Sequence, residues 1–451
     1  MANVVPLPNA RGASSPIGLF LRVGELSYRQ AEILHHEGRL PINHAIFDAS
    51  KFKHQKGFAK TLREAGTEII LDTKAAELAA PAKYSGNAAG TPWSDEKLHQ
   101  LGDFEGARAK ALAARIARFA VEEGFDRVIS PAHYLKSGVT DPWFRLDLSM
   151  CETLRVALDK EGGEKIAIDY PVIIDHMMLR DESQRGALVS LLSGLPYQNT
   201  LIRASNFGDH ASAPGLKEYI NSLDRLHNLG KPIIADHVGK LVGRAILAFG
   251  VASCIGHGLD EHERFSASQW AKFPVKHDGD ERKGGRAKRV SVFGLDKSLS
   301  IPELNALARA RGGHGLIVCN DPSCCRMGLK DMVGNSKGHS ITQEMRSLGA
   351  LNAVPDFKRA EYFLANDMTN ADRLARQVKE LKPLESELKP REGQTAKEAG
   401  EKLMARLADH ARRTEKMRSV LENHHAVRGV QAPRVPPVHI VERVQSFIQK
   451  R

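Results

Sequence analysis

"YPVIIDH", residues 170–176, is the stretch that decides the fold. Its middle is apolar and rich in β-branched residues, and it ends in Asp175 and His176. A strand with one face in water alternates apolar and polar side chains, whereas an unbroken apolar run indicates a strand that is buried on both faces. Such strands occur in parallel sheets that are covered by helices. The stretch therefore predicts an α/β protein.

Seven further runs have the same apolar character. They are residues 17–23, 44–50, 67–73, 126–134, 199–207, 231–237 and 251–258. Stretches with helical patterning lie between them, and some end at a glycine in the helix C-cap position, such as Gly124 and Gly250. Eight strand–helix units in about 250 residues match the size of a (β/α)8 TIM-like barrel. An open, doubly wound sheet of eight strands is the alternative.

The chain divides into three predicted parts. Residues 1–265 form the barrel, residues 266–345 form a basic insert with a Cys/His lobe, and residues 346–451 form a helical C-terminal extension. Within the lobe, "HGLIVCN" (314–320) predicts a further strand that leads into the cysteines. In the extension, Thr395 and Glu398 have the spacing of a capping box and predict the start of a long helix.

Composition indicates a soluble globular protein that binds an anionic partner. Hydrophobic residues make up 42% and charged residues 26% of the 451 residues, and the net charge is +11. No apolar run approaches the ~18 residues that span a bilayer, and the N-terminus lacks a secretory pattern, so we expect a cytoplasmic protein without a membrane partner. A nucleic acid is the commonest partner for such a positive excess, and a merely solvated basic surface is the alternative.

A cluster of potential metal ligands lies at residues 319–339. Cys319, Cys324, Cys325 and His339 follow the pattern C-x4-C-C-x13-H, and Asp321–Ser323 forms a turn between the first two cysteines. Thiolates and imidazole are the ligands that zinc prefers, and four protein ligands make a structural site. We therefore predict structural Zn²⁺ here, with His314 as an alternative fourth ligand. A loop with buried free thiols is the competing interpretation.

Polar residues end most of the predicted strands. In a parallel barrel the C-terminal strand ends form the active-site face, so these residues are expected to converge. Carboxylates that share a concave site alter one another's pKa, which is how a nucleophile or base is made. Four strands end in aspartate, although a terminal aspartate also serves as an ordinary helix N-cap. The candidates are Arg22, Asp48, Asp72, His133, Asp175, His176, Arg203, Asn206, Asp236, His237 and His257.

The basic insert at residues 272–289 is a second candidate contact for an anionic partner. It combines glycines with lysines and arginines, among them Lys283 and Arg286. A positively charged loop of this kind suits contact with a phosphate backbone without reading its sequence.

An eight-strand barrel with a Cys/Cys/Cys/His site near its end resembles the tRNA-guanine transglycosylase superfamily, which includes relatives that insert a deazaguanine base into DNA. The resemblance covers roughly residues 17–340, and "FDASKF" places Asp48 and Ser50 where that family has an aspartate that recognises the base, although the two glycines of the family turn are absent. The resemblance implies base exchange on tRNA or DNA, a zinc ion and an aspartate nucleophile, for which Asp236 is the candidate.

Three functional hypotheses follow. In the leading one, Asp236 attacks the sugar carbon, Asp48 and Asp175 grip the extruded base, and His257 assists. Further substrate contacts are expected from Asp72, Arg22, Arg203, Asn206, Lys283 and Arg286. The second hypothesis is a small-molecule hydrolase with a metal ion at the strand ends. The third is a non-catalytic subunit of a nucleic-acid-handling complex, whose C-terminal helices bind a protein partner or a second copy of the chain.

Overall fold

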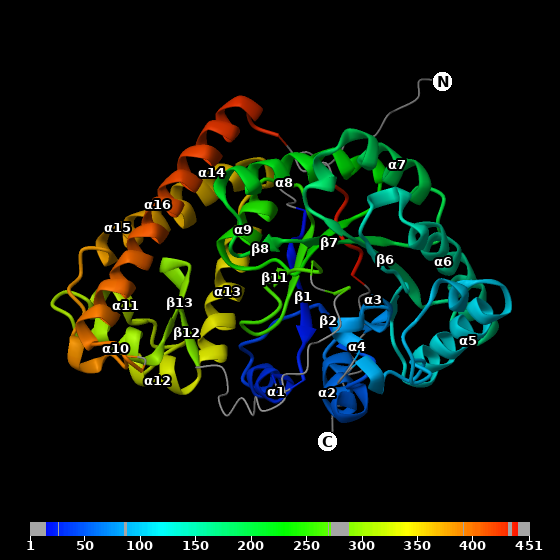
Figure 1. The fold of residues 1–451 in the computed structure, drawn as a ribbon, viewed down its shortest axis with the longest axis horizontal. Coiled ribbons are helices and arrows are strands. Elements are labelled where there is room, and N and C mark those ends of the chain that lie inside the picture. The colour runs from blue at the N-terminus through cyan, green and yellow to red at the C-terminus, as the bar shows by residue number, and fades with distance from the viewer. Residues whose placement is uncertain are drawn as a thin grey trace, which may run out of the picture.

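The fold is a closed parallel barrel with a lobe packed against its side. The computed structural model describes residues 15–440 apart from 26, 85–87, 269, 272–287, 391 and 432–434 (Figure 1). The eight barrel strands are β1 (Gly18–Val23), β2 (His44–Asp48), β3 (Glu68–Asp72), β4 (Arg127–Ile129), β6 (Ala167–Asp175), β7 (Asn199–Ser205), β9 (Ile233–Asp236) and β10 (Cys254–His257). Seven of them fall within a predicted apolar run, and β6 begins three residues before the run predicted at 170–176, so all eight predicted strands are present.

The hydrogen-bonded ladder runs around the barrel without an open edge. Its order is β1-β2-β3-β4-β6-β7-β9-β10, and β10 pairs with β1 again. Every pairing in this ring is parallel. Closure confirms the predicted (β/α)8 TIM-like barrel and removes the open-sheet alternative.

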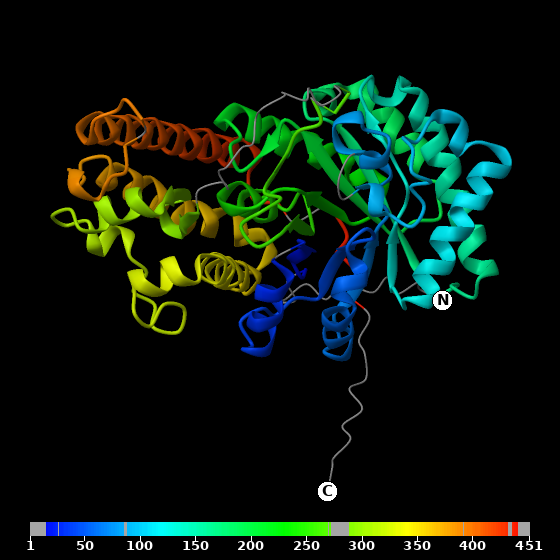
Figure 2. The same ribbon diagram turned by 60° about the horizontal axis from the view of Figure 1, so that its bottom comes forward.

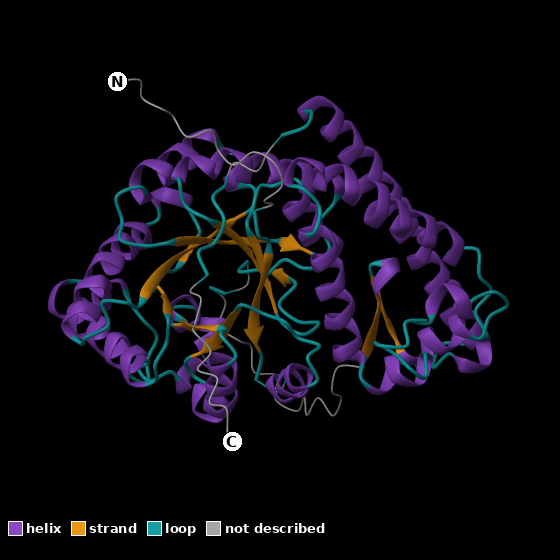
Figure 3. Ribbon diagram, turned by 180° about the vertical axis from the view of Figure 1, so that it is seen from behind, coloured by secondary structure: helices purple, strands orange, loops and turns teal. Residues whose placement is uncertain are grey.

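Helices surround the ring of strands (Figure 3). Those of the barrel are α1 (Tyr28–His36), α2 (Phe52–Glu64), α3 (Ala75–Leu78), α4 (Pro81–Tyr84), α5 (Gly106–Glu122), α6 (Pro142–Lys160), α7 (Glu182–Leu192), α8 (Ala213–Arg225) and α9 (Lys240–Ala248). Gly124 and Gly250, two residues beyond the ends of α5 and α9, adopt φ values of 68° and 66°, a left-handed conformation that suits a residue without a Cβ. The predicted C-caps therefore end these helices.

Side chains inside the barrel form layers, because every second residue of a strand points inward. The middle layer is apolar and contains Phe20, Ile46, Ile70, Ile129, Leu201, Ile234 and Cys254. Two residues earlier on the strands, a buried charged network lies at the N-terminal end of the barrel. Arg127 pairs with Glu68 and Asp169, and His44 lies beside Glu68. Two residues later, the inward side chains are again polar and form the layer at the C-terminal mouth. The strand sequences thus place charged side chains on both sides of the apolar middle layer.

Residues after the last barrel strand build the lobe. It contains the antiparallel hairpin β12 (Arg289–Val292) and β13 (Lys297–Ser300), seen apart from the barrel in Figure 3. Its helices are α10 (Ile301–Ala308), α11 (His314–Ile317), α12 (Leu329–Gly334), α13 (Ser336–Asn352), α14 (Arg359–Phe363), α15 (Thr369–Val378) and α16 (Ala396–Arg428). The strand predicted at 314–320 is wrong, since residues 314–317 form α11; an apolar run this short does not distinguish strand from helix.

The lobe has its own hydrophobic core. Val290 and Leu304 share it with Leu403 and Leu407 of α16, so the hairpin and the C-terminal helix pack together. The capping box of α16 is present, since Thr395 N donates to Glu398 Oε2 at 2.8 Å. Further along α16, Met417 and Leu421 pack into the core of the barrel. The predicted domain boundary at residue 345 stays a prediction. Helix α16 contributes side chains to the hydrophobic cores of both the barrel and the lobe.

The segment after α16 returns to the barrel and closes its N-terminal end (Figure 2). Val438 joins the apolar inner layer and is 5% exposed. Ser253 Oγ donates to the Pro436 carbonyl at 2.6 Å, and Arg127 Nη2 donates to the His439 carbonyl at 3.2 Å. Chain from the far C-terminus therefore completes the barrel interior. Of the helices in the described ranges, none combines the length and hydropathy needed to span a bilayer.

Candidate functional site

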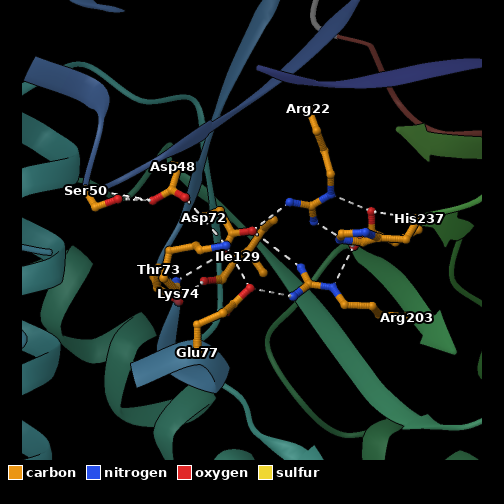
Figure 4. Close-up of polar contacts among 11 residues, drawn as sticks. Arg22, Asp48, Ser50, Asp72, Thr73, Lys74, Glu77, Ile129, Arg203 and His237 are labelled. Carbon is orange, nitrogen blue, oxygen red and sulfur yellow. Dashed lines mark hydrogen bonds and ion pairs between the residues drawn. The ribbon is translucent and has the colours of Figure 1, made fainter. Parts of the chain in front are cut away.

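Four buried charges meet at the C-terminal mouth of the barrel (Figure 4). Arg22 donates from Nε and Nη2 to Asp236 at 2.7 and 2.6 Å, and from Nη1 to Asp72 at 2.8 Å. Arg203 donates from Nε to Asp236 Oδ2 at 3.0 Å and from Nη2 to Asp72 Oδ2 at 3.4 Å. We call Arg22, Asp72, Arg203 and Asp236 the mouth quartet. They come from β1, β3, β7 and β9, so barrel closure alone brings them together.

The quartet keeps its two carboxyl groups ionised. Burial by itself would raise the pKa of Asp236, but the charges of Arg22, His237 and Arg203 outweigh it and hold the pKa well below the usual range. Burial opposes ionisation of Asp72 too, and Lys74, Arg22 and Arg203 lower its pKa. Both oxygens of Asp236 already accept hydrogen bonds, since Oδ1 also accepts from the backbone of His237 at 3.0 Å.

A second set of charges extends the quartet toward the rim. Lys74 Nζ lies 2.7 Å from Glu77 Oε1 and 3.5 Å from Asp48 Oδ2. Arg203 Nη1 lies 3.7 Å from the same Glu77 oxygen. Asp48 Oδ1 accepts from the backbone and hydroxyl of Ser50 at 3.1 and 2.8 Å. Asp48 is the more accessible strand-end acid, since 27% of its side chain is exposed against 0% for Asp236.

Left-handed backbone conformations concentrate around the same mouth. Six non-glycine residues in the loops after β3, β7, β9 and β10 have φ between 56° and 61°: Lys74, Asn206, His237, Lys240, Asp260 and His262. Such conformations are costly for residues with a Cβ and persist where the surroundings impose them, commonly at binding and catalytic sites. The strain therefore marks the C-terminal mouth, and not the opposite end, as the candidate functional site.

Two histidines lie beside the quartet. The rings of His237 and His262 meet edge to face with centroids 5.2 Å apart, and His237 also packs on Phe265. Desolvation and the nearby charge of Arg22 lower the pKa of His262 to about 4, so its imidazole is neutral at pH 7. Phe265 and Trp270 pack edge to face, with centroids 5.2 Å apart, and belong to an apolar cluster with Ala76 and Ile173. Phe265 places this cluster beside the quartet, since its ring centroid lies 5.8 Å from Cζ of Arg203.

His257 does not join the quartet. A Cβ built on its neighbour Gly256 would lie 2.7 Å from Asp236 Oδ1, so position 256 faces into the barrel and position 257 faces the outer helices. Nδ1 of His257 lies 2.9 Å from the Gly258 carbonyl, which only accepts, and therefore carries the proton. The catalytic role of His257 stays a prediction. Its side chain lies apart from the acids of the mouth quartet.

Beside His257 a lysine is surrounded by acids. Lys240 Nζ lies 2.6 Å from Glu263, 3.5 Å from Asp209 and 3.8 Å from Asp260. Burial, opposed by Lys240 and reinforced by Asp260, raises the pKa of Glu263 to about 8. Burial therefore favours the protonated form of Glu263, whereas the arginines favour the ionised form of Asp236. Two carboxyl groups with opposite shifts are the usual arrangement of an acid and a base or nucleophile.

The remaining strand-end candidates lie on the rim. Asn206 Nδ2 donates to Asp175 Oδ2 at 2.7 Å, and Ser266 Oγ donates to Asn206 Oδ1 at 2.9 Å. This chain of polar groups is accessible to solvent and separate from the quartet. His133 is instead buried beneath Trp143 and hydrogen-bonds to Asp147 at 2.7 Å. Lys283 and Arg286 lie outside the described residues.

The predicted metal ligands do come together. One ligand atom from each of Cys319, Cys324, Cys325 and His339 lies within 4.8 Å of the others, so the four could hold a metal ion. His339 Nδ1 lies 3.4 Å from the sulfur of Cys324 and 3.3 Å from that of Cys325. His314 is exposed and is not a member of this group. The turn at residues 321–323 and the first turn of α13 bring the ligands to one point.

The two other cysteines are unrelated to this centre. Cys151 and Cys254 are buried in the barrel, and burial raises the pKa of each thiol to about 12. They therefore remain protonated at neutral pH.

Several residues of the mouth were missed from sequence. All of them follow strands whose terminal residues were candidates: Glu77 lies in α3, Lys240 begins α9, and the others, Lys74, His262 and Glu263, lie in loops. The available signal was the density of charge in "DTKAAEL" (72–78) and "GLDEHERF" (258–265). A loop has no side-chain period, so sequence alone does not tell which of its charges point inward.

Comparisons with known proteins identify no family for this chain and give only distant structural matches. No protein-family model matches the chain, and no curated protein does. Xylanase 10C of Cellvibrio japonicus is 11% identical with a TM-score of 0.34, covering 54% of this chain and 61% of that chain. Xylanase 10B of Thermotoga maritima is 12% identical with a TM-score of 0.33, over 54% and 83%. Type I 3-dehydroquinate dehydratase of Clostridium difficile is 9% identical with a TM-score of 0.30, over 58% and 90%. Likeness of this degree carries no argument about function.

Proposed function

We propose that the chain is a barrel enzyme that exchanges or releases a base of a nucleic acid by attack on the glycosidic carbon. The observation that carries the proposal is the charge of the mouth, where four carboxylates (Asp48, Asp72, Glu77, Asp236) surround three cations (Arg22, Lys74, Arg203). Cleavage of a glycosidic bond develops positive charge on the sugar, which a site with ionised carboxylates and net negative charge stabilises.

The proposed reaction has two steps. An aspartate oxygen bonds to the anomeric carbon while the bond from that carbon to the base nitrogen breaks, and the electron pair stays on the nitrogen, which takes up a proton. An incoming base then displaces the aspartate and loses its own proton. Glu263, whose pKa burial raises to about 8, is the candidate donor.

Two acids compete for the role of nucleophile. Asp236 is ionised, but attack through Oδ2 would require both Arg22 and Arg203 to release that oxygen. Asp48 is reachable from solvent and is held by Ser50 and Lys74. We retain Asp236 as the leading candidate because it lies at the centre of the charge network, and Asp48 as the alternative that needs no rearrangement.

The metal that the lobe fits best is zinc. A tetrahedron with Zn–S bonds of about 2.3 Å and Zn–N bonds of about 2.0 Å has S···S edges of about 3.8 Å and S···N edges of about 3.5 Å. The sulfurs of Cys324 and Cys325 are 3.8 Å apart and lie 3.4 and 3.3 Å from His339 Nδ1. Four protein ligands leave no position for water, so the ion would stabilise the lobe and take no part in catalysis.

A groove beside the metal ligands supports a nucleic acid partner, tRNA or DNA. Its volume is about 380 Å³. Its lining includes Arg39, three residues after α1, and Pro322, Cys324 and Arg326 of the lobe. Together with the net charge of +11, these arginines suit contact with a phosphate backbone. Arg39 is held in place by Thr342 Oγ1, to which Nη2 donates at 3.0 Å.

The test is incubation of the protein with labelled guanine and either tRNA or duplex DNA, followed by isolation of the polymer and of protein–polymer adducts. We expect label in one polymer and an adduct that disappears in Asp236→Asn or Asp48→Asn, whichever residue is the nucleophile. Asp409→Asn, an exposed aspartate of α16, is the control. Absence of both label and adduct with both polymers would overturn the proposal.

A second candidate function is that of a non-catalytic subunit in a nucleic-acid-handling complex. The observation in its favour is the apolar cluster of Phe265 and Trp270, in which Phe265 lies against Arg203 of the mouth quartet. It predicts nucleic acid binding without any covalent adduct. The small-molecule hydrolase loses support, because within the described ranges the strand-end acids and histidines form no group with metal-ligand spacing.

A further inference from the structure

Two histidines lie between the mouth quartet and solvent. His237 Nε2 lies 4.0 Å from Asp236 Oδ2, and the ring of His262 packs edge to face on that of His237. Exposure rises outward along this series, since Asp236 is 1% exposed, His237 is 9% exposed and His262 is exposed. His262 is therefore the outermost of the three, and a ligand that approaches Asp236 from this side has to displace it.

His262 belongs to a short loop that is fixed at both ends. Leu259, at its start, is buried in the barrel core, and at its end β11 (Arg264–Phe265) pairs with β8 (Phe207–Gly208). Between these points Asp260 and His262 both adopt a φ of 58°, a left-handed conformation that is costly for a residue with a Cβ. This strained conformation persists only while surrounding contacts hold the loop in place.

One side-chain hydrogen bond ties this loop to the neighbouring strand end. Glu261 Oε1 accepts from Ser27 Oγ, which lies in the turn after β1. Glu261 Oε2 lies 3.6 Å from Lys337 Nζ, but that ion pair is partly exposed and contributes little. Asp260 approaches Lys240 Nζ only to 3.8 Å. The contact between Glu261 and Ser27 is therefore the closest polar contact that these loop side chains make with the rest of the barrel.

Two glycines make room for Glu261. A Cβ built on Gly24 would overlap with both Glu261 Oε1 and Ser27 Oγ, and a Cβ built on Gly258 would lie 2.6 Å from Glu261 Cγ. The backbone of Gly24 is outside the left-handed region, so it would accept an alanine without strain. The missing side chain at position 24 is thus required by the contact between Glu261 and Ser27, and not by the conformation of the turn.

We infer that Glu261 is a latch that holds the loop at residues 258–262 closed beside the mouth quartet. When Ser27 releases Glu261, the strained loop moves outward together with His262, and the quartet becomes accessible to a ligand from solvent. Loops that close over a binding or reaction site in this way exclude water and control entry. The inference does not rest on the proposed function, because any ligand of the quartet that approaches from this side meets the same loop.

The experiment measures how fast phenylglyoxal modifies the guanidinium of Arg22 in the full-length protein, with the modified residues identified by mass spectrometry. Arg22 is 7% exposed in the closed conformation, and the exposed Arg412 serves as the internal reference. Glu261→Ala removes the latch, and Gly24→Ala displaces it. We expect each to raise the labelling rate of Arg22 relative to Arg412 about tenfold, because losing a hydrogen bond to a charged group shifts an opening equilibrium by about this factor.

The matched control is Gly57→Ala, because a Cβ at that position of α2 would have no neighbouring atom within 4 Å. It should leave the labelling of Arg22 at the wild-type rate. Since Glu261→Ala and Gly24→Ala remove the same contact, the double variant should label no faster than either single variant. Thermal melts of each variant, which should remain folded at the labelling temperature, separate loop opening from unfolding. A wild-type rate in Glu261→Ala, or additive effects in the double variant, would overturn the inference.

Discussion

Nε2 of His339 lies 3.1 Å from the carbonyl oxygen of Ser291. A carbonyl oxygen only accepts, so Nε2 carries the proton and the lone pair of the neutral ring is on Nδ1, the nitrogen that faces the cysteines. A backbone contact from β12 thereby fixes both the tautomer and the orientation of the ring, as the second coordination sphere of a metal commonly does. The hairpin and the metal ligands are consequently one structural unit.

His339→Ala should abolish metal binding. The wild-type protein, purified without chelator, is expected to contain one zinc ion per chain by elemental analysis, and His339→Ala much less than one. Because metal binding contributes folding free energy to the small lobe, the variant should also lose the protease resistance of residues 288–345.

The matched control for that experiment is His314→Ala. His314 lies five residues before Cys319 and is exposed, so its removal should leave both metal content and protease resistance unchanged. Equal metal loss in the two variants would contradict the assignment of His339, and a wild type that retains no metal after purification in zinc-supplemented buffer would contradict the site itself.

Arg203→Met should destabilise the barrel strongly. The substitution leaves Asp72 and Asp236 buried with one guanidinium fewer, and breaking a buried ion pair costs about 3–5 kcal/mol. Urea unfolding followed by circular dichroism measures the difference. Arg412→Met removes an exposed pair with Asp409 and should change stability by less than about 1 kcal/mol. A similar effect of both changes would show that the quartet is not buried as described.

Glu263→Gln should change how stability depends on pH. The pKa of Glu263 rises to about 8 on folding, so the folded protein retains a proton that the unfolded chain releases near its ordinary value of about 4.3. The contribution of Glu263 to the free energy of unfolding is therefore fully present below about pH 4.3 and is lost as the pH rises to about 8.

The measurement for Glu263 is the melting temperature between pH 4.5 and 9. The wild type should lose stability relative to Glu263→Gln over this interval, and the two curves should run parallel above about pH 8. Glu415→Gln, an exposed glutamate on α16, serves as control and should follow the wild type throughout. Parallel curves for wild type and Glu263→Gln at all pH values would disprove the protonated state.

Val438→Asp should unfold the barrel although it lies near the C-terminus. Val438 packs in the inner apolar layer, where a carboxylate would be buried without a partner at a cost of about 3 kcal/mol or more. Val430→Asp, eight residues earlier and 67% exposed, should have little effect. Thermal melts compare the two. Equal stability of both variants would mean that the terminal segment does not close the barrel in solution.

Much of the barrel was predictable because its determinants are local. Each strand is an apolar run bounded by polar residues, and the period of two in a strand places Phe20 and Arg22, or Ile234 and Asp236, on the same inward face. The convergence of strand-end acids and the grouping of Cys319, Cys324, Cys325 and His339 followed from the same local patterns. Residues 314–317 were the exception, because a four-residue apolar run is compatible with either a helix or a strand.

What the sequence by itself determined is therefore the kind of element at each place and the identity of the charges at the strand ends. Only the tertiary structure decided which of those charges are partners. Arg22 meets Asp236 across 214 residues of chain, His339 meets Ser291 across 48, and Val438 fills a layer that begins with Phe20. Contacts between segments so far apart leave no period in the sequence; they arise when the ladder closes between β10 and β1, and that closure is a property of the whole chain.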